Sequence, residues 1–276
     1  MKGNKRLLII VYILTIVILL VLLFPFFVML STSFKSVQEV YTSPPHWIPH
    51  KFAWRNFTYV WKRYPLAKYF INSLIIASFA TILNIIVCIP AAYAVSRLRF
   101  RGRKSLLFSF LVVQMFSPVI VVISLFQVVV KLGLHNRLSS LILVNTVFTL
   151  AFSIWMLNGY FSGISMEIEE AALIDGCSRL RTIVHIILPI AMPGIVTVII
   201  YTFIWSWNEF MFALTFIDSM ARRPLTLGLY HFVGRWETQW HYLMTAAFMA
   251  VIPVILLFTL IEKQLVKGLS GGAVKE

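Results

Sequence analysis

The sequence predicts an all-α, polytopic membrane protein with about six transmembrane helices. Hydrophobic residues make up 60% of its 276 residues and charged residues only 12%, so its apolar surface exceeds what one soluble core can bury. Apolar stretches of about 20 residues recur along the chain, and each is long enough to cross about 30 Å of hydrocarbon as a helix. Because lipid offers the backbone no hydrogen-bond partners, helices are the expected form of these stretches.

The first span is expected at residues 7–30, behind the basic residues Lys2, Lys5 and Arg6. A cleavable signal peptide begins in a similar way. This apolar run is too long for one, however, and no small-x-small cleavage site follows Phe24-Pro25-Phe26-Phe27. We therefore expect a retained span.

The other apolar stretches complete the bundle. They lie near residues 70–95, 106–130, 137–161, 188–216 and 242–262. With a loop at 162–187 and a tail at 263–276, the whole chain 1–276 is expected to form a single transmembrane domain. Prolines that fall in or near the spans free backbone carbonyls and let helices bend. These prolines are Pro90, Pro118, Pro193 and Pro253.

Basic residues set the expected orientation. Lys2, Lys5 and Arg6 place the N-terminus in the cytoplasm, and an even number of spans returns the C-terminus to the same side. The basic run at residues 97–104, between the second and third spans, agrees. Residues 31–69 are also basic yet must lie outside, which is acceptable because long segments follow the charge rule less strictly.

The net charge of +14 raises the alternative of a nucleic-acid-binding protein. The cations flank apolar spans, however, and do not interleave with aromatic residues on a soluble face, so we expect anionic lipid headgroups as partners and no nucleic acid. The two cysteines, Cys88 in a predicted span and Cys177 in the 162–187 loop, indicate no disulfide. No metal site is expected.

Two short helices are expected in the 162–187 loop. Ser165 can cap the first helix, acidic residues follow in its positive first turn, and Gly176 ends it where a left-handed residue is favoured. Ser178 can cap the second helix, and Pro189 is expected to begin the next span.

The first of these helices has the character of a docking helix. Ala171 and Ala172 leave its middle without bulk, so another protein can approach closely, and its acidic residues form a charged rim. The alternative is an amphipathic connector on the membrane surface. Such a helix normally presents Lys and Arg to the headgroups, whereas this one is acidic.

The same loop resembles the loop motif of the permease subunits of bacterial ABC importers. The matching positions are Glu170-Ala171-Ala172, Gly176 after three more residues, Ile186 and Leu188-Pro189. The loop also lies between two late spans, as it does in that family. Four or more fixed positions over about twenty residues make this spacing specific.

The resemblance implies that the loop forms a coupling helix, which sits in a cleft of a separate ATPase subunit. The residues it assigns to ATPase coupling are Glu169, Glu170, Ala171, Ala172, Asp175, Gly176, Leu188 and Pro189. The chain lacks the sequence G-x-x-x-x-G-K-[ST], so we expect it to bind no cofactor, to hydrolyse no ATP and to be no enzyme. ATP is expected in partner subunits.

The whole chain is also similar to the shorter, maltose-type second permease of the carbohydrate importers. The features lie at Phe24-Pro25, residues 31–35, Asn72-Ser73, residues 91–94 followed by Arg97, residues 207–210 and the tail 268–275. In that subfamily the tail reaches the ATPase dimer interface, and Gly268, Gly271 and Gly272 match it. A frayed chain end is the alternative.

The loop at residues 217–241 resembles the segment of that subfamily that contacts the solute-binding protein. Its Tyr230, Trp236 and Trp240 are equally compatible with membrane-interface anchors. Glu209 is the one acid predicted inside a span, with Asn208 beside it as a ready partner. This pair marks either the translocation pathway or helix packing, because both roles use the same residue types.

The resemblance implies an importer in the bacterial inner membrane. Its expected partners are a second, homologous permease, two ATPase subunits, an extracytoplasmic solute-binding protein and a carbohydrate cargo. Three alternatives remain: an ABC importer permease for a non-sugar solute, an ion-coupled secondary transporter and an intramembrane enzyme. The secondary transporter requires repeats and broken helices with midplane charges, of which the sequence indicates only Glu209. The enzyme requires paired acids, or a histidine with a nucleophile, within spans.

Overall fold

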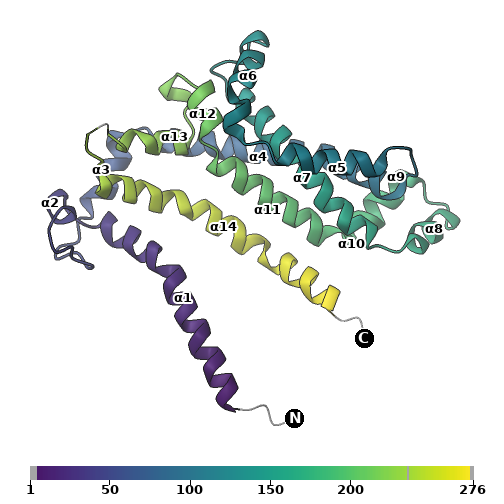
Figure 1. The fold of residues 1–276 in the computed structure, drawn as a ribbon, viewed down its shortest axis with the longest axis horizontal. Coiled ribbons are helices and arrows are strands. Elements are labelled where there is room, and N and C mark those ends of the chain that lie inside the picture. Colours follow the sequence, from purple (N-terminus) through teal and green to yellow (C-terminus); the bar gives the residue numbers. More distant parts are fainter. Residues whose placement is uncertain (1–4, 235, 274–276) are drawn as a thin grey trace. The chain divides into compact units, whose positions relative to one another are not determined.

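The computed structural model describes residues 5–234 and 236–273, except for the side chains of residues 6, 7, 261 and 263–273. The described residues are mostly helical and contain no β-strand beyond an isolated bridge between Val233 and Thr238. The chain divides into two compact units, each of which is described by itself (Figure 1). One comprises Met1–Leu66 and Leu229–Ile252, and the other comprises Ala67–Gly228 and Pro253–Glu276.

Four helices are long and apolar enough to cross a membrane unaided in the part of the chain that the structure describes. They are α1 (Lys5–Ser33), α4 (Leu66–Arg97), α7 (Leu138–Ser162) and α14 (Trp240–Ala273). Two bent helix pairs raise the number to six if each pair counts as one span. The predicted all-α, multi-span fold is therefore confirmed, and the single domain stays a prediction.

The third predicted span is not one straight helix. It consists of α5 (Arg103–Gln114) and α6 (Pro118–Lys131), which meet at an angle of 98°. Ser117 is extended, with φ −66° and ψ 135°, because the ring of Pro118 disfavours helical backbone in the residue before it. Pro118 also lacks the N–H that would continue α5, so it begins a new helix instead.

The fifth predicted span is broken as well. The short helices α9 (Arg179–Thr182), η1 (Ile183–Ile187, a π-helix) and α10 (Leu188–Ile190) lead to a bend of 77° before α11 (Met192–Asn208). Pro189 lies in the first turn of α10, and the expectation that it begins the span stays a prediction. Pro193 lies in the first turn of α11, and the bend falls at Ala191.

The same span also ends earlier than expected. Glu209 follows α11 in extended conformation, with φ −64° and ψ 130°, and a separate helix, α12 (Met211–Phe216), comes after it. Broken helices are therefore a main feature of this unit. The bends at Pro118 and close to Pro193 agree with the prolines expected to let helices bend, whereas no proline predicts the break at Glu209. Short helices α13 (Leu225–Leu229), η2 (Met220–Arg222) and η3 (Tyr230–Phe232) lead towards α14.

The first unit gathers α2 (Val37–Val40) and α3 (Arg55–Arg63) around the end of α1. The buried amide of Asn56 on α3 donates to the carbonyls of Ser33 (2.8 Å) and Lys35 (2.9 Å). The Thr245 hydroxyl of α14 reaches the same Ser33 carbonyl at 3.1 Å. These bonds satisfy carbonyls that the end of a helix leaves without partners, and so fix where α1 stops.

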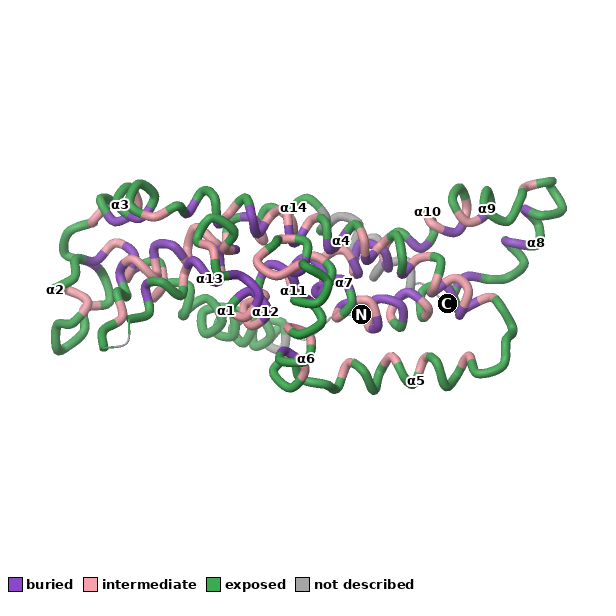
Figure 2. The backbone as a smooth tube through the Cα atoms, turned by 90° about the horizontal axis from the view of Figure 1, so that it is seen from above, coloured by how far each residue is buried: buried purple, intermediate pink, exposed green. Residues whose placement is uncertain are grey.

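The second unit is built on α7, which packs against α11, α5 and α12. Buried apolar side chains of α4 and α7 run along its interior, while α5 buries none of its described residues (Figure 2). Two hydrogen bonds cross this interior between α4 and α7, from the Asn84 amide to the Thr149 hydroxyl at 2.8 Å and from the Thr146 hydroxyl to the Ala80 carbonyl at 3.4 Å. A bond of this kind fixes the register of two helices inside a bilayer.

Candidate functional site

The 162–187 loop folds locally as its sequence predicts. Its first helix, α8 (Met166–Ile174), begins at Ser165, whose hydroxyl accepts from the Glu167 N–H at 3.2 Å. Gly176 follows the helix with φ +84°, and the N–H of Cys177 returns to the Ala172 carbonyl at 3.0 Å. Helix α9 is capped in turn by Ser178. Both caps arise from side chain to backbone bonds within a few residues, so the sequence is sufficient to locate them.

Helix α8 has two faces. Glu170, Ala171, Asp175 and Gly176 are exposed. Glu169 and Ala172 are buried, with 7% and 4% of their surface exposed. Of the predicted coupling residues, Leu188 is half-buried and Pro189 is exposed. The loop therefore offers a partner a surface that combines acidic residues with exposed apolar ones such as Ile174, and it packs Glu169 and Ala172 on its own chain.

Glu169 is held by the end of α4. It forms an ion pair with Arg97, and its other carboxylate oxygen accepts from the Tyr93 hydroxyl at 3.0 Å. Arg97 also donates to the Ile164 carbonyl at 2.9 Å, at the start of the loop. Sequence reasoning did not assign a role to Tyr93 or Arg97. They lie one turn apart at the end of a span and belong to the segment, residues 91–94 followed by Arg97, in which the chain resembles the carbohydrate permeases.

Glu209 lies at the break between α11 and α12. Its carboxylate accepts from the N–H groups of Phe212 (2.6 Å) and Ala213 (3.0 Å), so it caps α12. Its carbonyl accepts from the Thr226 hydroxyl at 2.6 Å. Asn208 is not its partner, because the Asn208 amide donates instead to the Ile204 carbonyl at 3.0 Å.

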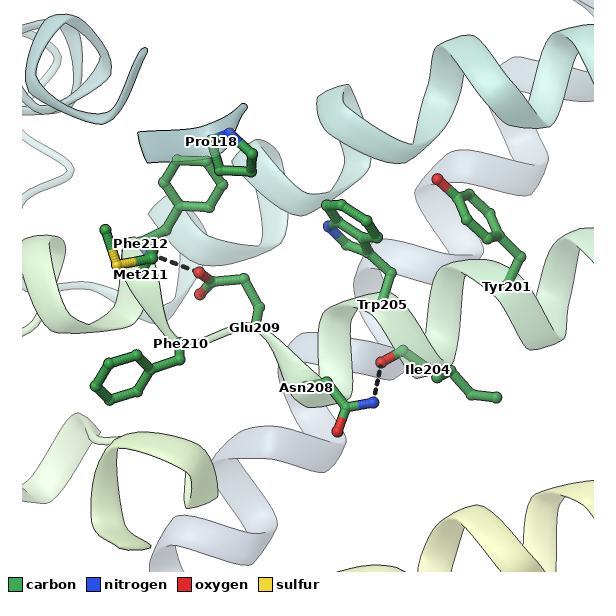
Figure 3. Close-up of a pocket in the computed structure, with 9 residues that line it drawn as sticks. All are labelled: Pro118, Tyr201, Ile204, Trp205, Asn208, Glu209, Phe210, Met211 and Phe212. Atoms are coloured by element: carbon green, nitrogen blue, oxygen red, sulfur yellow. Dashed lines mark hydrogen bonds between the residues drawn. The ribbon is translucent and has the colours of Figure 1, made fainter. Parts of the chain in front are cut away.

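A cavity of about 580 Å³ opens at this break (Figure 3). Its lining residues are Pro118, Tyr201, Ile204, Trp205, Asn208, Glu209, Phe210, Met211 and Phe212. A second cavity of about 410 Å³ shares Pro118 and Trp205 with the first and reaches Gln114 and Ser117 at the α5–α6 bend. The two helix breaks therefore line two neighbouring cavities that share Pro118 and Trp205.

Tyr201 and Trp205, which line this cavity, were not recognised from the sequence. They are four residues apart on α11, so they share one face of the helix. Their rings lie 6.2 Å apart between centroids. Aromatic pairs at this spacing are common in packed helix bundles, so the sequence does not mark this pair as part of a cavity. Only the position of the helix breaks does so.

Two further regions were assigned roles from the sequence, the loop at residues 217–241 and the C-terminal tail. In the first unit, Trp236 has 93% of its surface exposed in the turn that the Val233–Thr238 bridge closes, and Tyr230 and Trp240 are also exposed. The tail glycines Gly268, Gly271 and Gly272 belong to the C-terminal part of helix α14. Their assignment to an ATPase interface stays a prediction.

Comparison with known sequences extends these observations. Residues 84–270 match the family model described as the binding-protein-dependent transport system inner membrane component. The chain is 36% identical over 259 residues to the inner membrane ABC transporter permease protein YcjP of Escherichia coli, covering 93% of this chain and 92% of that protein. It is 35% identical over 274 residues to the trehalose/maltose transport system permease protein MalG of Thermococcus litoralis, covering 98% and 97%.

The fold is likewise similar to a solved structure. The neighbour belongs to a bacterial ABC transporter involved in the import of the acidic polysaccharide alginate, with a TM-score of 0.79 at 23% identity. The similarity covers 95% of this chain and 98% of that one. At this level of identity the match supports the fold alone.

Proposed function

Since this chain belongs to the family of binding-protein-dependent transport system inner membrane components, we propose that it is the permease subunit of an ABC importer for a carbohydrate. It forms half of the translocation pathway for an oligosaccharide that a solute-binding protein delivers. The observation that carries this proposal is α8, a short helix whose acidic and apolar residues are mostly exposed while Glu169 holds it to α4. A docking helix needs both an exposed surface for its partner and a fixed link to the rest of its own chain.

The choice of a carbohydrate rests on sequence similarity. The relative with 98% coverage of this chain bears the name of a trehalose/maltose system. This similarity favours a sugar over a peptide or amino acid.

Energy enters through partner subunits. The chain contains no G-x-x-x-x-G-K-[ST] sequence, so we infer that two separate ATPase subunits bind ATP and that this chain holds no cofactor and catalyses no reaction. Glu170 and Ala171 on the exposed face of α8, and Gly176 just after this helix, contact an ATPase subunit. A second, homologous permease completes the pathway.

The ion pair explains how movement of α8 reaches the membrane. Because Arg97 binds both Glu169 and the Ile164 carbonyl, a displacement of α8 pulls directly on the end of α4. In the other direction along the chain, α8 continues through α9 and η1 into α11. ATP binding therefore acts on two spans at once and switches the pair of permeases from inward-facing to outward-facing.

The orientation follows from the same contact. Arg97 brings the basic run at residues 97–104 and the α8 loop to the same end of α4. A basic run of this kind is typical of the cytoplasmic side. We therefore propose a bacterial inner-membrane protein with both termini and the α8 loop in the cytoplasm.

One observation favours an ion-coupled transporter instead. The broken helices and the carboxylate of Glu209 at a break are features of that class. In this chain the carboxylate accepts from two backbone N–H groups of α12, which gives it a structural role. Family membership also favours the ABC importer.

The first experiment is a pull-down in detergent with a tag on this chain, followed by mass spectrometry and an ATPase assay with a panel of neutral and acidic oligosaccharides. A P-loop ATPase, a second permease and sugar-stimulated hydrolysis are expected. A chain that purifies alone would overturn the proposal.

A matched pair of glycine variants then tests the docking helix. Gly176→Val and Gly133→Val each place a β-branched residue at a left-handed position, φ +84° and +66°, with no neighbour within 4 Å, so both add similar strain of roughly 1–2 kcal/mol. Gly176→Val should insert normally and lose transport, while Gly133→Val should retain it. Equal uptake by the two variants would count against α8 as the docking helix.

A further inference from the structure

The cavity at the α11 break is lined mainly by aromatic and apolar side chains. Tyr201 and Trp205 project to the same side of α11, towards Pro118 (Figure 3). Phe210 and Phe212 lie on the other side of the break. With the adjoining cavity, the space amounts to about 580 Å³ and about 410 Å³, in the range of pockets that hold small organic ligands.

Polar groups converge on this space. The indole N–H of Trp205 is buried and has no hydrogen-bond partner among the described residues. The Tyr201 hydroxyl accepts from the Gln114 amide at 3.1 Å, which leaves its own proton free to donate. The carboxylate of Glu209 lines the same cavity. A buried donor without a partner costs free energy unless a ligand or water satisfies it.

We propose that this cavity is a saccharide-binding subsite that belongs to this subunit itself. The inference rests on the proposed carbohydrate function and adds that this permease touches the cargo directly. One sugar ring lies against Trp205 and Tyr201, whose faces suit the apolar C–H surface of a pyranose. Its hydroxyls accept from the Trp205 N–H and donate to Glu209 or to the side-chain oxygen of Gln114.

The side chains that line the cavity favour a sugar over two other possible occupants, a lipid acyl chain and an apolar side chain of the partner permease. A lipid acyl chain offers no acceptor to the Trp205 N–H. An apolar side chain of the partner permease leaves the same N–H unsatisfied. A saccharide, with apolar faces and hydroxyl edges, matches both the aromatic faces and the polar groups.

The position of the cavity also suits a binding subsite in a translocation pathway whose helices move during transport. It lies between the α5–α6 bend and the α11–α12 break, so its walls come from helix segments joined by non-helical residues. Such segments can shift relative to one another without breaking a continuous helix. Binding and release of a sugar can therefore accompany the change of state that α8 drives.

The test uses the complete transporter in proteoliposomes, with the solute-binding protein in excess and the saccharide that stimulates the ATPase. Sugar uptake and ATP hydrolysis are measured together, because loss of a cargo contact lowers the sugar carried per ATP. Trp205→Ala should lower this ratio about tenfold. Glu209→Gln and Trp205→Phe, which keep most of the side-chain shape, should lower it about threefold.

Trp155→Ala is the matched control. Trp155 lies on α7 with 43% of its surface exposed, and it lines neither cavity. Its substitution should leave the uptake ratio unchanged. An equal ratio for Trp205→Ala and Trp155→Ala would overturn the subsite.

A direct readout covers the case in which Trp205→Ala fails to assemble. The stimulating sugar is given a diazirine group and photo-cross-linked in the wild-type complex during turnover. Labelling of residues 201–212 supports the proposal. Labelling confined to the partner permease overturns it. So does native mass spectrometry that finds a lipid bound to this chain in place of the sugar. If no saccharide of the panel is carried by the wild type, the carbohydrate function itself fails.

Discussion

Two carboxylates of the second unit, the buried Glu169 and the half-buried Glu209, are stabilised in opposite ways. Glu169 is neutralised by side chains of a distant helix, through its ion pair with Arg97 and the bond from Tyr93. Glu209 is held by the backbone N–H groups of the helix that directly follows it. One contact therefore joins elements 76 residues apart, and the other is local.

This difference separates a coupling contact from a structural one. A buried ion pair fixes two elements to each other and transmits displacement, but it leaves a costly unpaired charge when one partner is removed. A carboxylate cap stabilises one helix end and does not join it to a distant element. Removing each contact in turn tests this distinction.

The largest effect is expected for Arg97→Met. It leaves the Glu169 carboxylate buried without its cation, which should cost about 3 kcal/mol or more. Thermal denaturation of the assembled transporter, followed by size-exclusion chromatography, measures the loss. Adding Glu169→Gln should recover much of the stability while transport stays low, because the α4–α8 link is still missing. A double variant no better than the single one would show that the pair does not act as a unit.

Glu209→Ala should have the next largest effect on stability. It leaves the N–H groups of Phe212 and Ala213 without partners, at a cost of about 1–3 kcal/mol. Thr226→Val, which removes the single bond to the Glu209 carbonyl, serves as a milder comparison near 1 kcal/mol. If Glu209→Ala proved as damaging as Arg97→Met, the local nature of this cap would be refuted.

Tyr93→Phe should have a smaller effect. It removes the hydroxyl bond to Glu169 and keeps the ion pair with Arg97, so we expect a loss of about 1 kcal/mol. The same thermal assay applies, and transport should remain within about threefold of the wild type. A complete loss of transport would assign Tyr93 a larger share of the α4–α8 link than the geometry gives it.

The smallest effect is expected at Glu39, an acid in the first unit outside the spans. Burial opposes its ionisation, but the backbone and side-chain hydrogen bonds from His50 outweigh this and lower the pKa of Glu39 below 4.5. Its contribution is therefore complete above the unfolded-state pKa and disappears as the pH falls through the lowered value. Glu39→Gln should cost less than about 1 kcal/mol at neutral pH.

The stability difference between the wild type and Glu39→Gln should then shrink as the pH falls below 4.5. Denaturation at a series of pH values checks this. A difference that grows on acidification would mean that the folded state raises the pKa of Glu39.

The sequence by itself determined the spans and the caps of the docking loop. Apolar stretches near 7–30 and 137–161 became α1 and α7 because the length and composition of a segment decide whether it crosses lipid. Ser165 and Gly176 became helix boundaries because their bonds and dihedral angles involve only neighbouring residues.

The tertiary structure decided where helices break and which acid of a pair turns inward. Hydropathy is an average over many residues, so it does not register the break after Gln114 or the extended residue Glu209. Glu169 and Glu170 are adjacent and chemically alike, and neighbouring helix positions differ in direction by about 100°. Only the approach of Arg97, far away in the sequence, determines that Glu169 is buried while Glu170 stays exposed for a partner.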